Sequence, residues 1–158
     1  TIELQKGTLS VSDMGVVKRH VLRNVERAAQ HAFGAHKGTW RVQLHLHRER
    51  ILGVRLFHAE HTPVLDNPNG DVLLEVSSTA VLICDLRKEV AAAATDGALR
   101  LTARLAQSGQ RGVALVESFG LVTAVEPGNY RVQVDRGPDG LVVALGLDVQ
   151  VKVWPESS

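Results

Sequence analysis

The histidines of the first half of the chain have a spacing that could bind a metal ion. His45 and His47 are separated by one residue, and His58 lies in the next apolar segment. On a strand, side chains two residues apart point to the same face at about 6 to 7 Å from each other, so two imidazoles could bind one zinc ion. The more common use of such a pattern is the solvated face of an amphipathic strand. We therefore expect no cofactor, with zinc at His45, His47 and His58 as the alternative.

Nucleophilic catalysis has little support in the sequence. The single cysteine, Cys84, lies in the apolar run Val-Leu-Ile-Cys-Asp, where a cysteine is usually buried and unreactive. Asp85 follows it directly, so on a strand its side chain points to the opposite face and cannot activate the thiol. No serine is flanked by the glycines of a nucleophile elbow. We therefore assign no catalytic residues and favour a protein that is not an enzyme.

Charge is distributed unevenly along the chain, although the net charge is only +1. Residues 1–61 carry a balance of +5 and all seven histidines, whereas the remaining residues carry −4. Arg19, Arg23 and Arg27 recur every four residues and could attract an anionic polymer. An isoelectric point near 8.0 and an aromatic content of 4% argue against nucleic-acid binding. Weak binding of anionic polymers is an alternative to a simple solvated face.

The stretch from Met14 to Phe33 has the spacing of an amphipathic helix. Its small apolar residues recur every three or four positions: Val17, Val21, Val25, Ala28, Ala29 and Ala32. Ser12 or Asp13 could cap its start, and Gly34 could end it. The pattern predicts one helix over about 13–34, packed on the rest of the fold.

The remainder of the sequence is typical of short antiparallel strands. Val42, Leu44 and Leu46 alternate with polar residues, and a second strand at about 52–58 follows closely enough to form a hairpin. Further β-branched segments lie between turn residues, at 71–76, 80–86, 99–105, 113–116, 121–125, 130–134, 141–145 and 149–153. We predict a single α+β domain over 1–158, mainly an antiparallel β-sandwich or barrel-like sheet over 39–154, with the one N-terminal helix packed on it.

The last third of the chain resembles a known family. Val125-Glu-Pro-Gly-Asn-Tyr-Arg-Val-Gln-Val134, a polar loop and Val149-Gln-Val-Lys-Val-Trp-Pro155 are similar to the closing hairpin of a bacterial β-sandwich family. This family includes the competence-associated nuclease inhibitor and immunity-like proteins. The helix predicted above has no counterpart in it. The resemblance implies a sandwich that binds another protein, such as a basic nuclease, through an acidic surface.

We expect a protein-interaction module that binds a partner protein, as an inhibitor or immunity-like protein does, or that self-associates. Residues near one hairpin tip and on the predicted helix are the candidate contacts: Asp135, Arg136, Asp139, Arg19, Arg23 and Arg27. The longest apolar run, from Val76 to Cys84, is far shorter than the roughly 20 residues that cross a bilayer. No signal peptide is visible, so we expect a cytoplasmic protein.

Overall fold

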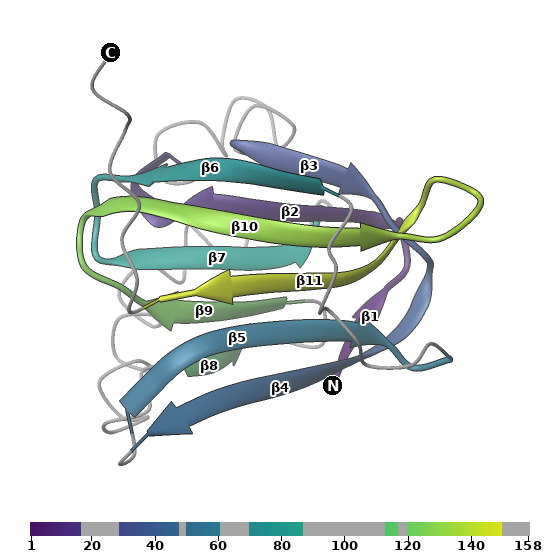
Figure 1. Cartoon of the computed structure of the whole chain (residues 1–158), viewed down its shortest axis with the longest axis horizontal. Coiled ribbons are helices and arrows are strands. Elements are labelled where there is room, and N and C mark those ends of the chain that lie inside the picture. Colours follow the sequence, from purple (N-terminus) through teal and green to yellow (C-terminus); the bar gives the residue numbers. More distant parts are fainter. Residues whose placement is uncertain (17–28, 48–49, 61–69, 87–112, 117–119, 150–158) are drawn as a thin grey trace.

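Two antiparallel sheets make up the described part of the chain (Figure 1). The computed structural model describes residues 1–16, 29–47, 50–60, 70–86, 113–116 and 120–149. The strands are β1 (Ile2–Leu4), β2 (Thr8–Asp13), β3 (His31–Gly34), β4 (Gly38–His47), β5 (Arg50–His58), β6 (Gly70–Val76), β7 (Ala80–Asp85), β8 (Val113–Val116), β9 (Gly120–Ala124), β10 (Gly128–Arg136) and β11 (Val142–Asp148). One sheet has the order β1-β4-β5-β11-β10-β6, and the other has the order β3-β2-β7-β9-β8.

The two sheets lie face to face around a common core. On β10, the side chains of Tyr130, Val132 and Val134 are buried, while those between them are at least partly exposed. This period of two is the pattern of a strand with one buried face. The core cluster contains residues of both sheets, including Trp40 of β4 and Ile83 of β7. The prediction of a mainly antiparallel β fold is therefore confirmed.

The chain passes from one sheet to the other at several turns, and two buried carboxylates hold two of these turns. Asp85, at the end of β7, accepts the backbone N–H groups of residues 5 to 8 at 2.8 to 3.3 Å. Asp13, at the end of β2, accepts the backbone N–H groups of Ser77, Ser78 and Gly15. Both side chains are almost completely inaccessible to solvent. Their charges are compensated by hydrogen bonds, as burial of a carboxylate requires.

The predicted helix over about 13–34 is not supported. Asp13 is the last residue of β2, and of the described residues that follow it, Met14, Gly15 and Val16 are helical. At the other end of the predicted helix, His31–Gly34 is strand β3, which pairs with β2. Residues 17–28 lie outside the described part of the chain. The backbone hydrogen bonds of 31–34 go to a distant strand, so long-range pairing outweighs the local helical spacing.

Most of the predicted strands are present in the structure. The segments expected at 40–47 and 52–58 form the β4–β5 hairpin, and those expected between 71 and 86 form β6 and β7. The segments expected at 113–116, 121–125, 130–134 and 141–145 correspond to β8, β9, β10 and β11. The segment at 99–105 and all but the first residue of 149–153 lie outside the described residues.

Candidate functional site

The structure places His58 away from His45, two of the histidines that the sequence suggested as zinc ligands. His58 pairs with Trp40 near the start of β4, five residues before His45. At about 3.4 Å per residue, His58 lies about 17 Å along the strand from His45. The fold therefore does not bring His58 to the other two histidines.

Both ring nitrogens of His58 have hydrogen-bond partners. The backbone N–H of Glu60 donates to Nδ1 at 3.3 Å, so Nε2 carries the proton and donates to the C=O of Lys37 at 2.9 Å. The ring is buried and meets the ring of Trp40 edge-on, with 5.9 Å between the centroids. Neither nitrogen offers a lone pair to a metal ion. Among the described residues, no three or more His, Cys, Asp or Glu side chains form a group that could hold one.

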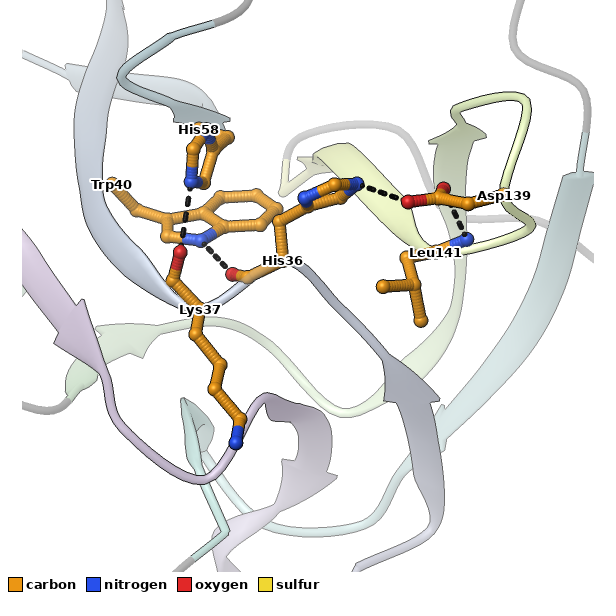
Figure 2. A network of polar contacts seen from close by, with 6 residues as sticks. All are labelled: His36, Lys37, Trp40, His58, Asp139 and Leu141. Atoms are coloured by element: carbon orange, nitrogen blue, oxygen red, sulfur yellow. Dashed lines mark hydrogen bonds and ion pairs between the residues drawn. The ribbon is translucent and has the colours of Figure 1, made fainter.

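The connection between β3 and β4 crosses from one sheet to the other beside His58. Ala35 forms a parallel bridge with Val142, and the N–H of His36 donates to the C=O of Val142 at 3.2 Å. The indole N–H of the fully buried Trp40 donates to the C=O of His36 at 2.8 Å. These bonds tie the connection to the core. They hold the ring of His36 at the surface, with its centroid 5.4 Å from that of His58 (Figure 2).

The turn between β10 and β11 lies next to His36 and is closed by its own hydrogen bonds. The N–H of Gly137 donates to the C=O of Leu141 at 2.9 Å, and the N–H of Gly140 donates to the C=O of Gly137 at 3.0 Å. Gly140 has a φ of 82°, which glycine adopts without steric cost. Oδ1 of Asp139 accepts the N–H of Leu141 at 3.1 Å. The turn therefore has a defined conformation and holds the side chain of Leu141 at 38% exposure.

His36 and Asp139 join the two connections. Nε2 of His36 lies 2.9 Å from Oδ2 of Asp139, and the two groups form an ion pair when the imidazole is protonated (Figure 2). The same carboxylate accepts the N–H of Leu141 through its other oxygen. Next to the turn, the guanidinium of Arg136 lies over the ring of Phe33, 5.9 Å from its centroid. We call His36, Arg136, Asp139 and Leu141 the corner surface.

Two residues that the sequence suggested as partner contacts, Arg136 and Asp139, belong to the corner surface. Asp135 precedes Arg136 and pairs with Ala144, with its side chain half-buried on the outer face of the sheet. The other suggested contacts, Arg19, Arg23 and Arg27, lie outside the described residues. The sequence Gly137-Pro-Asp-Gly140 marked the turn, but no local signal pointed to His36, because its partner is about a hundred residues away in the chain.

No protein-family model, curated protein or solved structure matches this chain. The resemblance of residues 125–155 to the nuclease-inhibitor family stays a prediction. Within the described ranges, no helix is both long enough and apolar enough to cross a membrane.

Proposed function

We propose that the protein is a protein-interaction module that binds its partner through the corner surface. The observation that supports this proposal is a half-exposed leucine on a fixed turn. Leu141 lies beside Asp139, and the turn that carries it is bonded both internally and to His36. An apolar side chain with charged and polar residues around it has the arrangement of a protein interface, in which a polar rim surrounds an apolar centre.

The fixed geometry of the turn favours binding because little freedom remains to be lost. Binding to a mobile loop costs free energy for ordering the loop, whereas a loop that is already ordered does not incur this cost. Hydrogen bonds within the turn and to the β3–β4 connection supply that order. Loops on a rigid β-sheet scaffold are also where binding residues are commonly found.

The finer form of the proposal is an inhibitor or immunity-like module. It is supported by the resemblance of the closing hairpin and by the balance of −4 after residue 61. An acidic inhibitor associates faster with a basic enzyme because opposite charges steer the encounter. Self-association through the same surface is the other form of the proposal.

The test is capture of a partner by the wild type and by two matched variants. Leu141→Asp places a charge on the corner surface, whereas Leu73→Asp places it on β6, where the side chain is 46% exposed. With a tagged protein in a lysate of its source cells, we expect one protein to be retained in stoichiometric amount by the wild type and by Leu73→Asp. Leu141→Asp should lose it.

If light scattering instead shows a dimer that Leu141→Asp dissociates, the partner is a second copy. Equal retention by both variants, or a monomer that captures nothing, would overturn the proposal.

A further inference from the structure

Among the strands that the structure describes, β4 has an open edge along most of its length. The strand spans Gly38–His47, but β1 pairs only with its first three residues, of which Trp40 is the last. On its other side, β4 pairs with β5 along its length. In Figure 1, β4 lies at the margin of its sheet. Beyond Trp40, this edge has no neighbouring strand among the described residues.

The backbone groups that face this edge are those of Val42 and Leu44. The C=O of Thr39 accepts the N–H of Ala59, at 2.9 Å, on the β5 side. Because alternate residues of a strand direct their N–H and C=O groups to opposite sides, Arg41 also faces β5, and Val42 and Leu44 face the open edge. No described residue forms a hydrogen bond to these edge groups. They can receive the N–H and C=O groups of an added strand.

The side chains at the edge are also incompletely covered. Val42 and Leu44 pack against the core cluster but are only half-buried. They point to the inner face of the sheet, as Trp40 does, because all three lie two residues apart. An added strand with apolar residues on its inner face would bury them further. The edge therefore favours a segment that has an apolar residue at every second position.

The outer face beside the edge is basic. On β4 it carries the exposed Arg41 and Gln43 and the half-buried His45, and Arg55 lies opposite Gln43 on β5. A second copy of β4 paired antiparallel about Gln43 would place Arg41 of one copy opposite His45 of the other. Neither residue carries a negative charge, so this arrangement contains no pair of opposite charges. Acidic side chains on an added strand would instead find opposite charges.

We propose that the open edge of β4 binds an extended segment of a partner protein in which acidic residues alternate with apolar ones. The segment adds to the sheet as a strand. Its backbone pairs with Val42 and Leu44, and its apolar residues cover their side chains. Its acidic residues lie on the basic outer face, with Arg41 on the neighbouring strand and Arg55 one strand further away. This edge is distinct from the corner surface, and the proposal does not depend on the function proposed for that surface.

The test uses the full chain, labelled with ¹⁵N, and a blocked peptide of sequence Thr-Glu-Val-Glu-Val-Glu-Val-Thr. We expect saturable shifts of the amide resonances of Val42 and Leu44, and an affinity that falls as salt is added. A peptide with lysine in place of each glutamate should bind at least about tenfold more weakly. A peptide methylated on alternate amide nitrogens lacks the donors for the edge and should not bind.

Two variants locate the binding. Leu44→Pro removes an N–H that faces the open edge and leaves the hydrogen bonds between β4 and β5 intact. Proline is tolerated at such an edge position of a strand. Arg41→Glu reverses a charge at the edge and should weaken binding about tenfold, even if Leu44→Pro does not fold. Arg131→Glu, an exposed arginine on β10 of the same sheet, is the control and should bind as the wild type does.

Several outcomes would overturn the proposal. The lysine peptide could bind as tightly as the glutamate peptide, or the shifts could fall on β6 or on the corner surface. The peptide could also fail to bind at concentrations up to about 1 mM. Its binding free energy would then be weaker than about −4 kcal/mol. A concentration-dependent dimer that Leu44→Pro dissociates would place a second copy at this edge instead.

Discussion

Asp13 and Asp85 lie at opposite ends of the β2–β7 strand pair, and each carboxylate holds the turn that leads into the other's strand. Asp85 ends β7 and binds the turn before β2, whereas Asp13 ends β2 and binds the turn before β7. Both turns carry the chain from the six-stranded to the five-stranded sheet. The two carboxylates therefore fix the two sheets to each other at both ends of the β2–β7 strand pair.

We expect Asp85→Asn to lower the free energy of unfolding by about 1 to 3 kcal/mol. Each oxygen of Asp85 accepts two backbone N–H groups, and the asparagine side chain would place an NH₂ donor against two of them. Urea unfolding of both proteins measures the difference. Asp71→Asn is the control, because this exposed carboxylate pairs with the exposed Arg131. Its replacement should lower the free energy of unfolding by less than about 1 kcal/mol. Equal costs for the two variants would contradict the role of Asp85.

Asp13 should make the protein sensitive to acid. Burial raises the pKa of its carboxyl, but hydrogen bonds from Ser78, Ser77 and Gly15 outweigh burial, and the pKa lies below its ordinary value. A carboxyl that is more acidic in the folded than in the unfolded state stabilises the fold above the unfolded pKa of about 3.9. That contribution is lost as the pH falls through the lower, folded pKa.

The comparison of wild type with Asp13→Asn isolates this contribution. We expect the wild type to have the higher free energy of unfolding near pH 7, and the difference to shrink below about pH 4. Unfolding by urea at a series of pH values measures it. A difference that stays constant down to pH 2 would show that ionisation of Asp13 does not contribute.

Strands made of apolar or alternating residues could be predicted from the sequence, whereas β2, in which buried serines lie between apolar residues, could not. On β10, buried Val132 and Val134 alternate with polar residues, and this contrast is visible in the sequence. On β2, Ser10 and Ser12 are as buried as Val11, so the polarity of the residues does not reveal which face each occupies. β3 could not be predicted either, because it is a strand through its pairing with β2.

The candidate site was predictable only in part, for a similar reason. Glycine, proline and aspartate set a turn through local backbone preferences, so the turn around Asp139 could be read directly. The contact with His36 depends on the bridge between Ala35 and Val142, which the tertiary fold creates. His58 lies away from His45 because the hairpin register, which the sequence leaves open, places His58 opposite Trp40.

Thr123→Val should stabilise the protein by about 1 kcal/mol. The threonine is fully buried on β9, and its hydroxyl has no hydrogen-bond partner among the described residues. Valine has nearly the same shape and removes the cost of burying an unpaired polar group. Ser10→Ala is the opposite case, since the Ser10 hydroxyl donates to the C=O of Cys84 at 3.1 Å, and this change should destabilise. Thermal unfolding measures both, and a lower melting temperature for Thr123→Val would contradict the prediction.

Asp139→Ala should loosen the β10–β11 turn without unfolding the protein. The change removes the acceptor of the Leu141 N–H and the contact with His36, so we expect the Leu141 amide hydrogen to exchange about tenfold faster. The free energy of unfolding should fall by less than about 1 kcal/mol, because both side chains are partly exposed. Hydrogen exchange followed by NMR measures the first effect, and urea unfolding measures the second. Asp71→Ala removes an exposed carboxylate of β6 and should leave exchange at Leu141 unchanged. If Asp139→Ala also leaves it unchanged, the carboxylate does not hold the turn, and the fixed geometry invoked for the corner surface must have another source.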